Sequence, residues 1–242
     1  MPEATQSATR SSRFFAYSGL LIAALIFASF PITYYQPLAT GTKQFTLLRH
    51  LHGAVFFGWT LLIAVQPWLV RQGRIKLHRS LGLVGVALAG AMVPLGLWLA
   101  TVAIQDRIAQ KYALPFEFAL YNLVDILLFA LFTGWAIHQA TRRIEWHRRL
   151  IFVAMLMLLG PAWSRLWFEF APFPFPWYDL APNVSADLLL LALAWHDRKV
   201  LGRIHPVTLW SALVLIPFHA AEPLIARSAA WNALAPGLFG FS

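Results

Sequence analysis

Seven apolar stretches, each about the length of a membrane-crossing helix, constrain the fold of this chain more than any other feature. A transmembrane α-helix needs about 20 consecutive apolar residues, whereas transmembrane β-strands show an alternating pattern that this sequence lacks. We therefore predict an all-α integral membrane protein, a bundle of seven transmembrane helices. The predicted spans run from Phe14 to Ile32, Thr46 to Val70, Leu81 to Ile104, Phe116 to Ile137, Leu150 to Phe168, Leu180 to Trp195, and Val207 to Ile225.

The distribution of charge between the predicted loops gives the bundle an orientation. Most of the 19 Lys and Arg residues lie on the side that holds the N-terminus and every second loop, and most of the 10 acidic residues lie in the opposite half. Basic loops stay in the cytoplasm, so we predict the N-terminus inside and the C-terminus outside. The same loops account for the net charge of +9. The expected partner is therefore the lipid bilayer and not nucleic acid.

The chain shows no sign of a second domain. Residues 1–12 are polar and rich in Ser and Thr, and we expect them to form a disordered tail. Residues 13–242 are expected to form a single polytopic domain, with the first span retained as a signal anchor. The chain has no cysteine, which excludes disulfides, thiolate nucleophiles and cysteine-bound metal centres.

Five ionisable side chains fall within the apolar stretches, on five different predicted helices and at a similar depth in the outer half. A charged side chain in the bilayer interior costs about 2.5–3.5 kcal/mol even on a lenient insertion scale, so such residues usually face one another or a polar cavity. We therefore predict a buried polar site on the outer side. The five residues are His52, Asp125, Arg165, Asp187 and His219.

Helix-face counting adds neighbours to this outer group and separates it from two inner histidines. Arg49 lies one turn before His52, and Glu222 follows His219 by three residues. At the inner face, the segments 74–79 and 143–148 share the pattern Arg-Ile-x-x-His-Arg at the start of the third and fifth spans. Their histidines are His78 and His147.

Two non-haem uses fit the outer group. An ion-pair network of Arg165 with Asp125 or Asp187 would fix the register of the helices without any chemistry. A metal site of two histidines and one or two carboxylates would suit zinc or non-haem iron and would support hydrolysis or metal handling. Its ligands would be His52, His219, Asp187 and Glu222.

The third use is a haem b redox centre. Two histidines on facing helices would be the outer axial ligands, with an arginine directed to the propionates. The two inner histidines would hold a second haem and complete an electron path across the bilayer. In this hypothesis the cofactor-binding residues are His52, His219, Arg49, His78 and His147, and the catalytic, proton-handling residues are Asp125, Arg165 and Asp187.

Three motifs lie along the middle of the chain: His52…Trp59…Gln66, the helix start Leu77-His78-Arg79-Ser80-Leu81-Gly82, and Trp146-His147-Arg148-Arg149…Arg165. In these motifs the chain resembles a bacterial family of uncharacterised predicted membrane proteins. The resemblance covers roughly residues 50 to 168 and implies a multi-span protein of the bacterial inner membrane without an established activity. The chain is also faintly similar to the transmembrane diheme cytochromes b, which ligate two haems with His pairs on a four-helix core.

We favour a multi-pass redox protein of the bacterial cytoplasmic membrane that binds haem b and exchanges electrons with a quinone or another redox partner. One alternative is the membrane-embedded metal site for hydrolysis or metal handling. The other is a non-catalytic structural or assembly protein. The sequence leaves open whether the chain is an enzyme.

Overall fold

The computed structural model describes residues 2–171 and 174–241 of the 242-residue chain. Helices make up 85% of the structure, and the described residues form no strand. This confirms the all-α prediction. In chain order the elements are α1 (Pro2–Ala28), a π-helical turn η1 (Pro31–Tyr35), α2 (Gln36–Thr40), α3 (Leu47–Arg71), α4 (Ile75–Ala109), α5 (Glu117–Gln139), α6 (Ile144–Phe170), α7 (Trp177–Leu201), α8 (Pro206–Arg227) and α9 (Ala229–Leu238).

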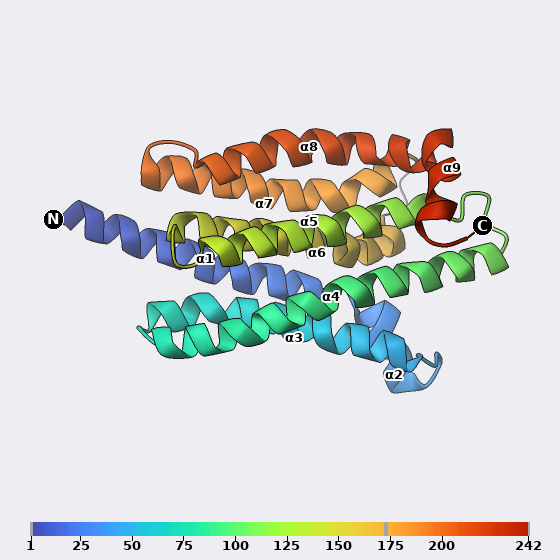
Figure 1. Ribbon diagram of the computed structural model, residues 1–242, viewed down its shortest axis with the longest axis horizontal. Helices are drawn as coiled ribbons and strands as arrows, with labels where there is room; N and C mark the ends of the chain where they lie inside the picture. Colours follow the sequence, from blue (N-terminus) through green and yellow to red (C-terminus); the bar gives the residue numbers. More distant parts are fainter. Residues whose placement is uncertain (1, 172–173, 242) are drawn as a thin grey trace.

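The long helices run along the longest axis of the molecule (Figure 1). The N-terminus and the turns that join α3 to α4, α5 to α6 and α7 to α8 lie at one end, which we call the amino-terminal end. The C-terminus, α9 and the remaining connections lie at the opposite, carboxy-terminal end. The connections thus alternate between the two ends, as they do in a bundle that crosses a membrane repeatedly.

Five of the described helices are long and apolar enough to cross a membrane, namely α3, α4, α5, α6 and α8. The count rises to six if α1 and the segment Pro31–Thr40, bent by 41°, form one broken span. The structure therefore has the helices of a multi-pass membrane protein. The segment predicted from Leu180 to Trp195 is helical as part of α7, but α7 is not among the candidates, because buried polar residues such as Asn183 and Asp187 interrupt its apolar run.

Several boundaries differ from the predicted spans. α1 begins at Pro2, so the backbone of the polar segment 2–12 is helical in the structure. The short helices α2 and α9 lie outside the predicted spans; α9 begins where the Ser228 hydroxyl accepts a hydrogen bond from the Trp231 amide at 3.1 Å. α4 has 35 residues, about 52 Å at 1.5 Å per residue. It is therefore longer than the hydrocarbon layer of about 30 Å.

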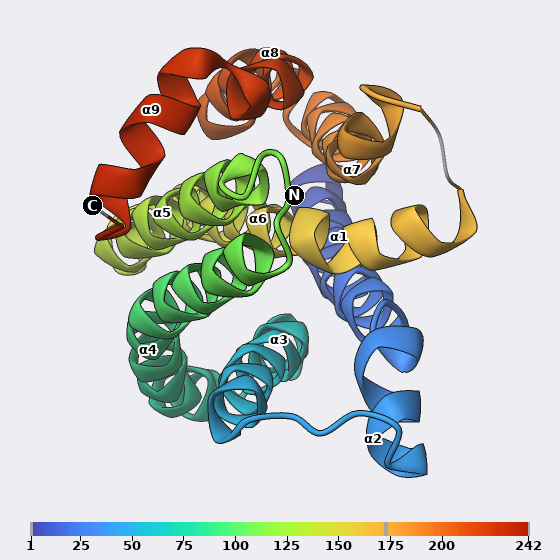
Figure 2. The ribbon, with the colours of Figure 1, turned by 90° about the vertical axis from the view of Figure 1, so that its right-hand side faces the viewer.

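α6 is the most enclosed of the five apolar helices. Buried residues make up 56% of its most apolar window, against 22–33% in the other four. Figure 2, a view along the bundle, shows α6 near the middle, between α5 and α1. Its residues from Phe152 to Leu159 belong to the main hydrophobic core. A charged residue on the inward face of α6, such as Arg149, therefore has other helices as its neighbours.

Candidate functional site

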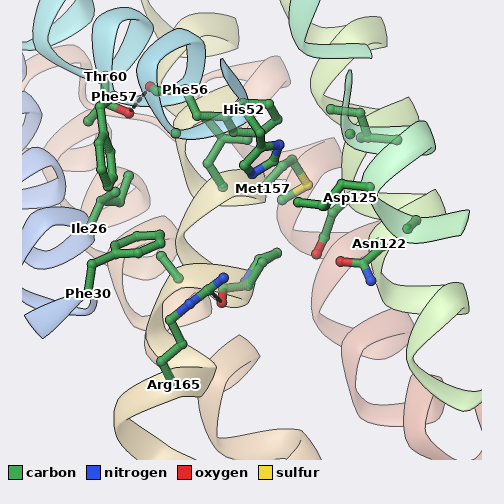
Figure 3. Close-up of a pocket in the computed structure, with 18 of the residues that line it drawn as sticks. Ile26, Phe30, His52, Phe56, Phe57, Thr60, Asn122, Asp125, Met157 and Arg165 are labelled. Atoms are coloured by element: carbon green, nitrogen blue, oxygen red, sulfur yellow. Dashed lines mark hydrogen bonds between the residues drawn. The ribbon is translucent and has the colours of Figure 1, made fainter. Parts of the chain in front are cut away.

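A cavity of about 260 Å³ lies between α1, α3, α4, α5 and α6 (Figure 3). Most of its wall is apolar: Phe30 and Phe56 contribute aromatic rings, and Gly96 and Ala100 of α4 leave room at another side. Such a wall favours an amphipathic occupant over a hydrated ion. The ionisable and carboxamide side chains that reach the cavity are His52, Asn122, Asp125 and Arg165.

The cavity brings together three of the five ionisable residues that the sequence places inside the apolar stretches. His52 lies near the first residue of α3, Asp125 lies in the first half of α5, and Arg165 lies near the last residue of α6. α3 and α5 begin at the carboxy-terminal end of the bundle, and α6 ends there (Figure 1). The similar depth inferred from the sequence therefore places these three side chains at one level.

Arg165 lacks the carboxylate partner that a buried guanidinium usually has. Its Nη1 donates to the carbonyl oxygen of Pro161, one turn back on α6, at 2.5 Å. The guanidinium carbon also lies 4.4 Å from the centre of the Phe30 ring, in a cation–π contact. No described acidic side chain lies within 4.0 Å of the guanidinium, so neither the Asp125 nor the Asp187 ion pair that the sequence suggested is present.

The other polar groups of the cavity are also short of partners. His52 stacks on Phe56 with 4.0 Å between ring centres, and its buried Nδ1 has no hydrogen-bond partner in the described part of the chain. Asp125 forms no hydrogen bond or ion pair with a described residue. Asn122 donates from Nδ2 to the Phe118 carbonyl at 3.1 Å, which leaves its amide oxygen for another group. Buried polar groups are nearly always paired, so this set points to a ligand or ordered water.

The remaining two predicted residues, Asp187 and His219, form a separate pair between α7 and α8. His219 Nδ1 lies 2.8 Å from Asp187 Oδ1, and both residues are buried. Close by, Asn183 Nδ2 donates to Glu222 Oε2 at 2.8 Å. Neither His219 nor Asp187 lines the cavity, so the structure does not bring His52 and His219 together as facing ligands.

Among the described residues, no three His, Asp or Glu side chains are grouped so that they could hold a metal ion. The four-ligand set of His52, His219, Asp187 and Glu222 is therefore not assembled in this conformation. Arg49 also lies outside the cavity. Its Nη2 forms an ion pair with Asp106 Oδ2 at 2.9 Å, which links α3 to α4 with both side chains partly exposed.

The two inner histidines have a common arrangement at the amino-terminal end. His78 Nδ1 lies 2.7 Å from Gln66 Oε1, and Gln66 Nε2 donates to the His78 carbonyl at 3.2 Å. His147 Nδ1 lies 2.9 Å from the Ala136 carbonyl oxygen. An oxygen acceptor at Nδ1 places the proton there and leaves the lone pair on Nε2. The two imidazoles are also near enough to interact electrostatically.

The most fully bonded polar cluster, which could not be predicted from the sequence, ties α6, α7 and α8 together at the amino-terminal end. Arg149 and Asp197 are completely buried and are joined at 2.5 Å between Nη2 and Oδ1. Asp197 Oδ2 also accepts from the Thr208 hydroxyl at 2.5 Å and from the His205 amide at 3.2 Å. In the sequence Arg149 is one of several basic residues at the start of a helix, a position that gives no sign of burial. The sequence feature that could have indicated an ion pair is Glu145, one turn earlier, which pairs with Arg149 at 2.5 Å.

These features describe an α-helical bundle with several helices apolar enough to cross a membrane, as in a multi-pass membrane protein, and with a partly polar cavity in one half of the bundle. Comparisons of the chain with models of known protein families, with curated proteins and with solved structures find no match. The family resemblance noted in the sequence therefore stays a prediction, and function is argued from the site itself.

Proposed function

We propose that the chain crosses the bacterial cytoplasmic membrane seven times, with its amino-terminal end inside, and binds the head group of a membrane-dissolved quinone in the His52–Arg165 cavity. The alternating connections and the basic loops at the amino-terminal end support this topology. In α7 the polar residues face protein neighbours and not lipid, which is how polar residues are accommodated within membrane spans.

The observation that carries the proposal is the cavity itself, in which the Arg165 guanidinium and the Asp125 carboxyl group do not form an ion pair with each other. Figure 3 shows Arg165 on one side and Asp125 with Asn122 on the other. A quinone head is a flat ring with a carbonyl oxygen at each of two opposite edges. Arg165 and His52 can donate to one oxygen, and the protonated Asp125 or the second N–H of the Asn122 amide to the other.

The rest of the cavity suits the same ligand class. The Phe56 ring offers a face for an aromatic or quinoid ring. The apolar lining from α1 and α4 suits the substituents and the first part of an isoprenoid tail. His52 and Asp125 can each exchange a proton, which a quinone needs when it is reduced to a quinol. A purely structural network accounts for the Asp187–His219 pair. It does not account for the unpartnered polar groups of the cavity.

Quinone binding can be tested on the purified full-length chain in lipid nanodiscs. We expect a short-chain ubiquinone to quench tryptophan fluorescence saturably. The His52→Ala variant should bind about 5–10-fold more weakly, since a net hydrogen bond is worth about 1 kcal/mol. Arg49→Ala is the matched control, because Arg49 lies on the same helix but outside the cavity. Equal affinities in wild type and His52→Ala, or quenching that does not saturate, would contradict the proposal.

A second function, haem b binding for electron transfer, is favoured by the inner pair and not by His52 with His219. His78 and His147 have Nδ1 engaged and Nε2 available, the arrangement in which outer-shell acceptors orient metal-bound imidazoles. Bound there, haem b would supply one-electron transfer.

We expect the purified chain to show a Soret band that shifts on reduction and that is lost in His78→Ala and in His147→Ala. The control is His138→Ala, which removes an exposed histidine from the same end. A colourless protein would overturn haem binding and leave quinone binding to its own test.

A further inference from the structure

Two matching rows of polar side chains run toward the carboxy-terminal end of the bundle, one from Asp125 at the cavity and the other along α7. On α5 the row is Glu117, Tyr121 and Asp125, and on α7 it is Asp179, Asn183 and Asp187, with each member four positions after the one before it. Residues four apart lie on one helix face, and eight residues span about 12 Å. Helix α8 contacts both helices and adds Glu222.

Several buried oxygen atoms along these rows have no hydrogen-bond partner in the part of the chain that the structure describes. They are the hydroxyl of Tyr121, Oε1 of Glu222 and both carboxyl oxygens of Asp179. Glu222 and Asp179 are only 1% and 4% exposed. An orphaned buried polar atom is costly, and ordered water is the usual partner where none is supplied by protein.

These orphaned atoms lie between a group that lines the cavity and a group that meets solvent. Asp125 interacts electrostatically with Glu222, and Tyr121 interacts with both Glu222 and Asp179. Arg227 Nη2 lies 3.9 Å from Asp179 Oδ2. The Arg227 side chain is 31% exposed, so the series ends at the surface.

The position of Glu222 in the middle of this series is held by close packing. Asn183 donates to Glu222 Oε2, which leaves Oε1 as the orphaned atom. A Cβ atom on Gly160 of α6 would lie 2.7 Å from Asn183 Oδ1, so glycine at this position admits the Asn183 amide. At its exit the series is bounded by an ion pair between Arg227 and Glu117.

We propose that water molecules between α5, α7 and α8 connect Asp125 to the outer aqueous phase through Glu222, Tyr121 and Asp179, and that protons reach the cavity along this path. Each transfer moves one proton between a water molecule and a side-chain oxygen, so that Asp125 is protonated from outside and returns the proton by the same route. A quinone in the cavity would take up two of these protons together with two electrons from an electron-donor protein, and in that respect the inference rests on the proposed function. Protons can reach Asp125 along this path whether or not a ligand occupies the cavity.

The ionisable and polar groups that face Glu222 are Asp125 and Tyr121 of α5, Asp179, Asn183 and Asp187 of α7, and His219 of α8.

Proton access can be measured by infrared spectroscopy on the full-length chain in lipid vesicles. The C=O stretching band of protonated Asp125 is identified by its absence in Asp125→Asn. After rapid mixing with D2O, the band of the wild type should shift as its proton exchanges. We expect Glu222→Gln and Tyr121→Phe to slow this exchange by about tenfold or more, equivalent to about 1.4 kcal/mol of added barrier. Asp106→Asn, which changes an exposed acid outside the rows, should exchange like wild type.

The two variants keep the test independent of any single folding defect, since Tyr121→Phe removes only a hydroxyl group. Exchange at the wild-type rate in both variants would overturn the path. Quinone affinity is measured on the same samples. Neither Glu222 nor Tyr121 lines the cavity, so a change in proton exchange can be distinguished from a change in quinone binding. Normal quinone binding with unaltered exchange rejects the path alone. Slowed exchange in a protein that binds no quinone rejects the ligand alone.

Discussion

Replacing Arg149 by alanine is expected to lower the free energy of unfolding by about 3–5 kcal/mol, because it leaves Asp197 as a buried charge without its cation. Both side chains are 0% exposed, and Asp197 lies at the junction of α6, α7 and α8. The midpoint of thermal unfolding of the full chain in detergent micelles, followed by tryptophan fluorescence, should fall by several degrees.

Two further variants show whether the effect comes from the unpaired charge. Arg79→Ala removes an exposed arginine from the same end of the bundle and should change stability by less than about 0.5 kcal/mol. The double variant Arg149→Met/Asp197→Asn removes both charges and keeps an oxygen for Thr208, so it should recover much of the loss. A single Arg149→Ala variant that unfolds like Arg79→Ala would refute this account of the cluster.

Replacing Arg165 by methionine is expected to weaken quinone binding by about 10–100-fold, since a hydrogen bond from a charged donor contributes about 1.5–3 kcal/mol. The same change should leave the unfolding midpoint equal to or above that of wild type. Arg165 has only the Pro161 carbonyl and the Phe30 ring as described partners, and an uncompensated cation is costly to bury.

The opposite signs of these two effects distinguish a binding group from a structural one. The measurement pairs fluorescence titration of a short-chain ubiquinone with a thermal melt of the same sample. Arg107→Met is a suitable control, because Arg107 is also partly buried but lies 3.7 Å from Glu117 and outside the cavity. Loss of stability in Arg165→Met without loss of affinity would assign Arg165 to packing.

The helices and the depth of the polar residues could be predicted from the sequence because both follow from one-dimensional patterns. An apolar run sets where a helix lies, and helix position sets the depth of a residue such as His52 or Arg165. The choice of partner could not be predicted, since two residues at equal depth can belong to different helix pairs. For that reason His219 pairs with Asp187 and not with His52.

At the inner end of the bundle, the burial of a charged residue could not be predicted from the sequence. An arginine at a helix start in a basic loop has the same sequence signature whether it meets water or the interior. Only the central position of α6 decides that Arg149 is buried. Gln66 lies fourteen residues, about four turns, after His52 and so on the same face of α3, and it is buried. The identity of its partner, His78, depended on the packing of α4.

In a bilayer, the length of α4 would make the cavity sensitive to the thickness of the surrounding lipid. Its apolar part from Leu81 to Ile104 measures about 36 Å along the helix axis, against a hydrocarbon layer of about 30 Å. A helix with such a hydrophobic mismatch tilts in the bilayer. α4 supplies Gly96, Ala100 and Ala103 to the cavity wall, so a change of tilt moves that wall relative to His52 and Asp125. Acyl-chain length would thus act on ligand affinity without any contact between lipid and ligand.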